Sequence, residues 1–183
     1  EEYSVAVFRR LGDFSGEMLK AVRAYATTFK AQNKVILEQR AQNNAEQFED
    51  VDTSDWYHEG VDFVIANGIM NGTSDTTFAP MQNVDRAMVM TVLYRMAGEP
   101  ATSGVCRFED VQSGSYYEDA VIWAADNGIL NGKTENRCDP KDPVTRQELA
   151  TFLYRFASHM GCDVSSRYDA LAAFTDADAV SYT

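Results

Sequence analysis

The pattern of apolar and polar positions occurs twice along the chain. Residues 48–97 align with residues 108–157 at a constant offset of 60 positions, without a gap. The matched pairs include Phe48 with Phe108, Asp50 with Asp110, Tyr57 with Tyr117, Val61 with Val121, Pro80 with Pro140 and Arg86 with Arg146. Self-similarity at a fixed spacing is typical of repeat architectures, so the sequence predicts tandem structural repeats.

Each copy is expected to form two helices joined by a turn-rich loop. In the first copy, Ser54 or Asp55 is the expected N-cap of a helix that runs to about Asn67, and Gly68 is the expected left-handed residue after it. The second helix has apolar residues at the i, i+3, i+4, i+7 spacing of one helical face. These residues are Val89, Val92, Leu93 and Met96 in one copy and Leu149, Phe152, Leu153 and Phe156 in the other. A single helix pair cannot bury such a face, so we expect an all-α fold of helix–loop–helix repeats around a shared helical bundle.

The predicted organisation has four parts. Residues 1–47 form an N-terminal segment with a long amphipathic helix over about 15–42, and the alternation at residues 3–7 favours a short strand before it. The repeats occupy residues 48–107 and 108–173, and residues 174–183 resemble the start of a third copy. The missing remainder of that copy has three interpretations: it was cut away, a second chain supplies it, or the N-terminal helix replaces it. That helix either packs on its own domain or self-associates as a coiled-coil stalk.

Composition and charge exclude several classes of function. Residues 1–47 have a net charge of +1 and residues 48–183 a net charge of −13, without a basic stripe, which argues against nucleic-acid binding. Apolar runs are far shorter than the roughly 20 residues of a membrane-spanning helix. The chain starts without Met or a leader-like segment, so we expect a processed or excised piece. The cysteines Cys106, Cys138 and Cys162 have no metal-ligand spacing; free thiols are favoured, and Cys106–Cys138 is the first pairing to test.

The repeated motifs resemble those of the S-layer homology domain. They are Phe-x-Asp-Val, an aromatic pair (Trp/Tyr-Tyr), Gly-Ile-x-Asn-Gly, Phe/Cys-x-Pro and Val-x-Arg, present at residues 48–157 in two copies. The resemblance implies three repeats around a pseudo-threefold bundle, with grooves that bind a pyruvylated secondary polymer of the bacterial cell wall. It therefore implies a secreted protein held non-covalently at the cell wall or S-layer.

Candidate ligand-binding residues follow from this resemblance together with helix chemistry. Arg86 and Arg146 lie in the first turn of the second helix of each copy, where a guanidinium and a helix N-terminus can act on the same carboxylate. The aromatic residues Trp56 and Tyr116, or their neighbours Tyr57 and Tyr117, are candidates for stacking on a sugar, with core packing as the competing interpretation. Gly72 and Gly132 would let the backbone approach a ligand, or are plain turn glycines. Asp50 and Asp110 are expected to brace a turn, and Asp85 and Thr145 to cap helices, with Glu148 completing a capping box that Met88 cannot complete.

An enzyme is not expected. The two histidines, His58 and His159, lie outside any catalytic motif, and the acidic run from Asp50 lacks the glycine and glutamate of an EF-hand. The sequence predicts no metal and no cofactor. The alternative function is a protein-binding surface module, with adhesion to a partner or self-assembly through the N-terminal helix.

Overall fold

The chain divides into two compact units, one formed by Gln32–Val144 and the other by Glu1–Ala31 with Thr145–Thr183. The structure, a computed structural model, describes residues 44–102 and 104–165. The predicted long helix, the short strand before it and the start of a third repeat all lie outside these residues. The boundary between the units falls within the second predicted repeat, just before its second helix.

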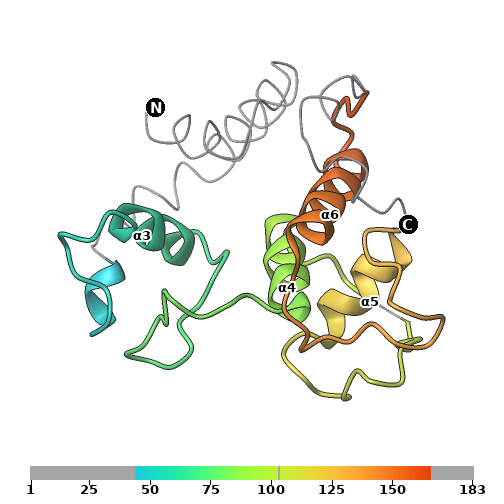
Figure 1. Cartoon of the computed structure of the whole chain (residues 1–183), viewed down its shortest axis with the longest axis horizontal. Helices are drawn as coiled ribbons and strands as arrows, with labels where there is room; N and C mark the ends of the chain where they lie inside the picture. Colours follow the sequence, from blue (N-terminus) through green and yellow to red (C-terminus); the bar gives the residue numbers. More distant parts are fainter. Residues whose placement is uncertain (1–43, 103, 166–183) are drawn as a thin grey trace. The chain divides into compact units, whose positions relative to one another are not determined.

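The described residues are all-α, as predicted. They contain a short 3-10 helix η1 (Asn44–Gln47) and the α-helices α3 (His58–Ala66), α4 (Arg86–Met96), α5 (Glu118–Asp126) and α6 (Arg146–His159) (Figure 1). Within these ranges, isolated β-bridges join Asp85 with Pro143 and Thr134 with Arg137. No helix in the described ranges is long and apolar enough to cross a membrane.

The first helix of each repeat ends at the predicted glycine. Gly68 after α3 has a φ of 65° and Gly128 after α5 a φ of 68°. The N–H of Ile69 donates to the carbonyl of Val64 at 2.9 Å, and the N–H of Gly68 donates to that of Ile65 at 3.0 Å. This pair of bonds is the Schellman arrangement, which satisfies carbonyls that the helix end leaves without partners.

The predicted start of this helix was wrong by a few residues. The N-cap of α3 is Tyr57, which makes no side-chain capping bond, instead of Ser54 or Asp55. The carboxylate of Asp55 instead accepts the N–H of Asp52 at 2.8 Å, and that of Asp52 accepts the N–H of Ser54 at 2.8 Å. These acidic side chains stabilise a turn before the helix, the competing use that short polar side chains have at helix starts.

The second helices begin as predicted. Asp85 caps α4 by accepting the N–H of Met88 at 2.7 Å. Thr145 and Glu148 form the complete capping box of α6, in which the Glu148 carboxylate accepts the Thr145 N–H at 2.9 Å and the Thr145 hydroxyl accepts the Glu148 N–H at 3.3 Å.

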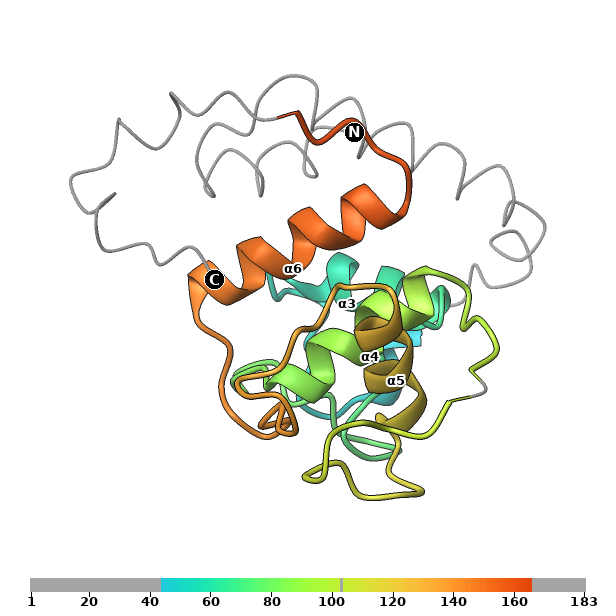
Figure 2. The same cartoon turned by 90° about the vertical axis from the view of Figure 1, so that its right-hand side faces the viewer.

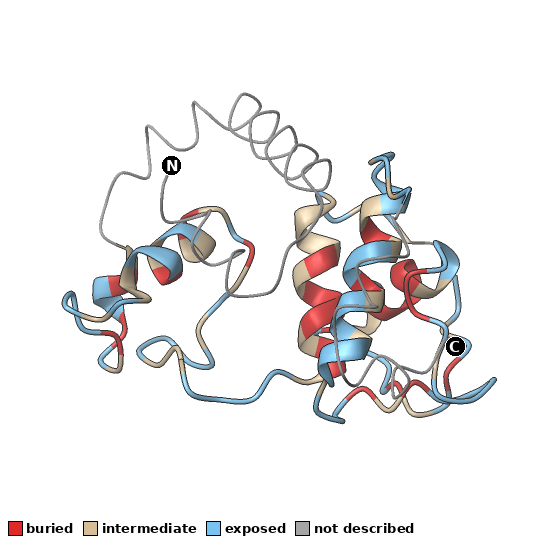
Figure 3. Ribbon diagram, turned by 45° about the horizontal axis from the view of Figure 1, so that its top comes forward, coloured by how far each residue is buried: buried red, intermediate tan, exposed pale blue. Residues whose placement is uncertain are grey.

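Within the Gln32–Val144 unit, α4 packs against α5, the first helix of the following repeat (Figures 1 and 2). The Tyr94 ring on α4 lies 5.6 Å from the Trp123 ring on α5, measured between centroids. The buried residues of this pair of helices include Ala87, Met90 and Leu93 on α4 and Ala120, Val121 and Ala124 on α5. Figure 3 colours the described ribbon by burial. The second helix of one repeat thus buries its apolar face on the next repeat, as repeat stacking requires.

Two smaller features complete the packing. In the first repeat, η1 packs against α3, and Phe48, Val51 and Val61 form a buried cluster there. On α6 the predicted apolar face is buried at Phe152 and Phe156 but exposed at Leu149 and Leu153. Half of that face is therefore exposed.

Candidate functional site: the junction between the repeats

Asp50 and Asp110 brace equivalent loops, as predicted. The two carboxylate oxygens of Asp110 accept the N–H groups of Cys138 and Asp139 at 3.1 and 2.8 Å. Asp50 accepts those of Phe78 and Ala79 at 2.8 and 2.7 Å, and these bonds, with that of Phe78 foremost, lower its pKa. Each aspartate holds the loop just before the motif proline, where Ala79 and Asp139 adopt φ values of 59° and 46°. This left-handed conformation is unfavourable for residues other than glycine, so the carboxylate bonds stabilise a strained turn.

Gly72 and Gly132 lie against the core of their own repeats. A Cβ on Gly132 would lie 2.7 Å from the Phe108 ring and 2.7 Å from the carbonyl oxygen of Thr134. A Cβ on Gly72 would approach the Phe48 ring and the Ser74 carbonyl oxygen just as closely. Both glycines therefore have a packing role in the loop, and contact between them and a ligand stays a prediction.

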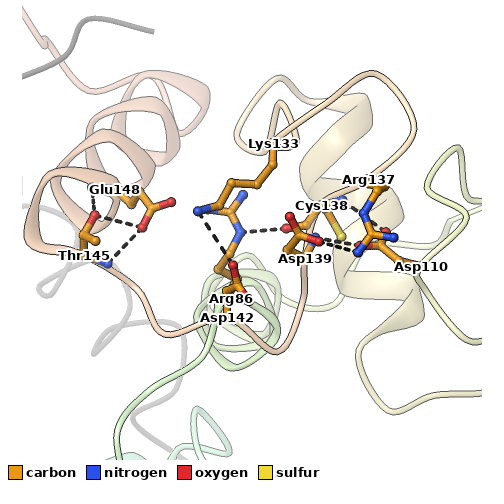
Figure 4. A network of polar contacts seen from close by, with 9 residues as sticks. All are labelled: Arg86, Asp110, Lys133, Arg137, Cys138, Asp139, Asp142, Thr145 and Glu148. Carbon is orange, nitrogen blue, oxygen red and sulfur yellow. Dashed lines mark hydrogen bonds and ion pairs between the residues drawn. The ribbon is translucent and has the colours of Figure 1, made fainter.

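Arg86 joins the two repeats. It is 4% exposed, and its Nε donates to the Cys138 carbonyl of the second repeat at 2.7 Å (Figure 4). The backbone N–H of Arg86 donates to the Asp142 carbonyl at 3.1 Å, and that of Ala87 donates to the Pro140 carbonyl at 2.8 Å. The start of α4 is thereby attached to the 138–142 loop. Its burial gives Arg86 a structural role at the junction, and contact between this guanidinium and a ligand stays a prediction.

Beside this attachment lies a partly exposed group of side chains that we call the junction cluster: Asp85, Tyr116, Tyr117 and Lys141. The Lys141 ammonium lies 4.7 Å from the centre of the Tyr117 ring, 5.1 Å from that of the Tyr116 ring and 3.4 Å from a carboxylate oxygen of Asp85. The two rings meet edge to face with centroids 5.0 Å apart. Burial acts to lower the pKa of Lys141, but the Asp85 carboxylate and Tyr116 together outweigh it and the pKa is raised. Lys141 therefore stays charged and is held over an aromatic surface.

The junction cluster is open to solvent on one side. Tyr116 is 60% exposed, whereas its neighbour Tyr117 is buried. The core-packing interpretation therefore holds for Tyr117 and not for Tyr116. An exposed aromatic face beside a fixed ammonium can accept both the apolar face of a sugar ring and an acidic substituent on it.

The first repeat has the aromatic part of this arrangement without the cation. Trp56 is 87% exposed and makes an edge-to-face contact with Tyr57 at 5.5 Å. The residue at the position of Lys141 is Met81, which is also exposed. The first repeat therefore lacks a cation at this position, and the hydrogen bond with the Asp55 carboxylate raises the pKa of Tyr57.

Arg146 belongs to the other unit of the chain. It is exposed in the first turn of α6, directly after the capping Thr145. It thus has the accessible position at a helix start that was predicted for both arginines.

The three cysteines are free thiols. Burial raises the pKa of Cys138 to about 12, and burial also raises that of Cys106. Cys138 occupies the position that Phe78 has in the first repeat, where Phe78 packs on Phe48 with ring centroids 5.6 Å apart. Cys138 is thus a small core residue within the loop that Arg86 contacts.

Comparison with known proteins settles what the repeat is. The family model of the S-layer homology domain matches residues 47–87 and 107–150. Both segments are S-layer homology repeats. Each match begins at the Phe-x-Asp motif and ends in the second helix, so it contains the braced loop and the cap described above.

Relatives with the same repeats include two surface-layer proteins and an enzyme. The chain is 32% identical to the surface-layer 125 kDa protein of Lysinibacillus sphaericus over 79% of its length and 26% identical to an S-layer protein of Bacillus thuringiensis subsp. finitimus over 70%. It is 30% identical to an endoglucanase of Bacillus sp. (strain KSM-635) over 68% of its length. The chain spans only 12%, 16% and 13% of these relatives, respectively.

The matches assign the chain to the cell surface. S-layer homology domains are non-catalytic anchoring modules that bind cell-wall polymers, and the repeats here are of that kind. The chain is therefore part of a protein associated with the cell surface or cell wall.

Sequence reasoning did not find Lys141. The equivalent residue of the first repeat is Met81, which has no charge, and the partners of Lys141 lie 24, 25 and 56 positions away in the chain. The usable signal was the repeat alignment itself, in which a lysine replaces a methionine beside the loop proline.

Proposed function

We propose that the chain anchors its protein to the cell envelope by binding a pyruvylated cell-wall polysaccharide at the junction cluster. The observation that carries the proposal is the Lys141 ammonium above the Tyr116 and Tyr117 rings, at the edge where two repeats meet. A pyruvate ketal presents a carboxylate on a sugar ring, and this site offers a cation and an aromatic face for those two parts.

The charge of Lys141 is available to such a carboxylate. Its contact with Asp85 is long for an ion pair, 3.4 Å, and Lys141 is exposed. A surface ion pair of this kind contributes only about 0–1 kcal/mol, so a ligand carboxylate can compete for the ammonium. A hydrogen bond to a charged group contributes about 1.5–3 kcal/mol when it is shielded from water.

The remaining predicted residues have distinct roles in this proposal. Arg86 is a positioning residue that holds the 138–142 loop, and with it Lys141, against the start of α4. Gly72 and Gly132 shape the loops through close packing. Trp56 supplies an apolar stacking surface for a sugar, and Arg146 an exposed cation for a second acidic unit of the same polymer. Several weak sites on one polymer chain would raise the overall affinity without new contacts.

The test is co-sedimentation of the chain with purified pyruvylated wall polymer. We expect Lys141→Met, which copies the first repeat, and Tyr116→Ala each to weaken binding roughly tenfold, a loss of about 1.4 kcal/mol. The matched control is Lys133→Met, because Lys133 is an exposed lysine of the same repeat whose ammonium lies 3.9 Å from a carboxylate oxygen of Asp142. If Lys133→Met weakens binding as much as Lys141→Met, the general charge of the repeat and not the junction cluster is responsible.

If the wild-type chain does not co-sediment with the polymer, the proposal is wrong. Binding would then be sought among proteins, the alternative that the sequence left open.

A further inference from the structure

The two carboxylate oxygens of Asp85 have different partners. One accepts the N–H of Met88 at 2.7 Å and caps α4, and the other lies 3.4 Å from the Lys141 ammonium. The backbone of Asp85 is held as well, by an isolated bridge to Pro143. The carboxylate is therefore a fixed part of the junction cluster, and the cation beside it is carried by a lysine side chain that is 59% exposed.

Capping a helix at this position of the repeat does not require a negative charge. Thr145 occupies the equivalent position of the second repeat and caps α6 with a neutral hydroxyl, which accepts the Glu148 N–H at 3.3 Å. Threonine and aspartate are both good N-cap residues. The charge of Asp85 thus adds something that the cap does not need, and the charge acts directly on Lys141.

An acidic ligand and a neutral one would meet Asp85 differently. A carboxylate on a sugar ring must replace the Asp85 oxygen beside the ammonium or share the ammonium with it, and either arrangement brings two negative charges close together. A neutral sugar on the Tyr116 ring leaves the Asp85–Lys141 pair as it is. Asp85 therefore opposes the binding of acidic ligands alone.

We propose that Asp85 is an internal competitor at the junction cluster: in the unbound protein its carboxylate occupies the place of the ligand carboxylate on Lys141, and it thereby limits the affinity for acidic sugar units. This inference rests on the proposed function, because it concerns the same site. It assigns to Asp85 a role in setting affinity in addition to its role as the cap of α4.

The experiment is calorimetric titration of the whole chain with pyruvylated wall polymer and with the same polymer after removal of the pyruvate. Asp85→Asn keeps the cap, since asparagine is as good an N-cap as aspartate, and removes the charge. We expect it to bind the pyruvylated polymer about two- to fivefold more tightly than the wild type, the range of a surface ion pair. Its affinity for the polymer without pyruvate should equal that of the wild type.

Two further variants attribute the gain to the contact with Lys141. Asp85→Thr, which copies the second repeat, should bind the pyruvylated polymer more tightly in the same way. In a Lys141→Met background, Asp85→Asn should have no effect, because no ammonium is left for the carboxylate to occupy. Circular dichroism should show that each variant is folded like the wild type.

Asp142→Asn is the matched control. It removes the same charge from the same loop, but its carboxylate lies 3.9 Å from Lys133, and we expect unchanged binding. If the wild type binds the polymer and Asp85→Asn binds no more tightly, this inference is overturned and the proposed function stands. An equal gain in Asp142→Asn, or with the polymer that lacks pyruvate, also overturns it. A wild type that does not bind the polymer overturns both.

Discussion

At the scale of single residues, the loops are held by side chains that the sequence motifs identify. The aspartate of Phe-x-Asp was expected to brace a turn, and it does so by accepting two backbone N–H groups. The sequence does not predict which N–H groups these are, because they lie 28 and 29 positions from the aspartate in the chain. Lys141 was not predicted for the same reason, because its role depends on contacts across the junction.

Asp110→Asn should lower the free energy of unfolding by about 1–3 kcal/mol, since an amide oxygen can replace only part of what the carboxylate accepts. Burial acts to raise the pKa of Asp110, but its hydrogen bonds to the Cys138 and Asp139 N–H groups lower it overall. A lowered folded-state pKa contributes stability above the unfolded value of about 3.9, and that contribution is lost as the pH falls through the folded pKa. Urea unfolding at several pH values checks this. The difference in the free energy of unfolding between wild type and variant should become smaller at acid pH. A difference in the free energy of unfolding that does not change with pH would contradict the role assigned to Asp110.

Cys138 should resist alkylation in the folded protein. Its thiol is buried and its pKa is raised to about 12, so almost no thiolate is present at about pH 8. Mass spectrometry after iodoacetamide treatment should find Cys138 unmodified in the native protein and modified after unfolding in urea. Rapid labelling of native Cys138 would show that the 138–142 loop opens.

At the scale of elements, helix ends were predicted better than helix faces. Gly68, Gly128, Asp85, Thr145 and Glu148 act as expected because their bonds lie within a few residues of the chain. The start of α3 was misplaced because two acidic residues before it were taken as caps and instead stabilise a turn. The face of α6 is only half buried because burial depends on what packs there, which periodicity alone does not contain.

Thr145→Ala should destabilise α6 by about 1 kcal/mol, the usual effect of losing an N-cap side chain. Thermal unfolding followed by circular dichroism checks the loss. Thr145→Ser is the matched control, since it keeps the hydroxyl that accepts the Glu148 N–H, and it should stay close to the wild type. Equal losses in the two variants would mean that the methyl group, and not the cap, stabilises the helix.

At the scale of the whole molecule, the tandem repeat and its family were readable from the sequence, because an ungapped offset of 60 residues preserves many motif positions. The pairing of α4 with the helix of the following repeat was not readable in detail. Repeat stacking requires some such contact, but the residues that form it are chosen by three-dimensional packing, as Tyr94 and Trp123 illustrate.

Polymer binding should depend weakly on salt. The repeat-containing part of the chain has a net charge of −13, so long-range attraction does not bring an anionic polymer to it. Recognition through a few local cations should weaken by less than about tenfold between low and moderate salt, since only a few charge contacts are screened. Co-sedimentation across a sodium chloride series checks this, and a steep decline would indicate a diffuse electrostatic mechanism.

The most direct test of the junction cluster is a two-by-two calorimetric titration. Wild type and Lys141→Met would each be titrated with intact polymer and with polymer from which the pyruvate has been removed. If the Lys141 ammonium recognises the acidic substituent, removing pyruvate should weaken the wild type clearly more than the variant, because the variant has already lost the partner of that group. Equal losses for both proteins would contradict the account, since Lys141 and the pyruvate would then act independently.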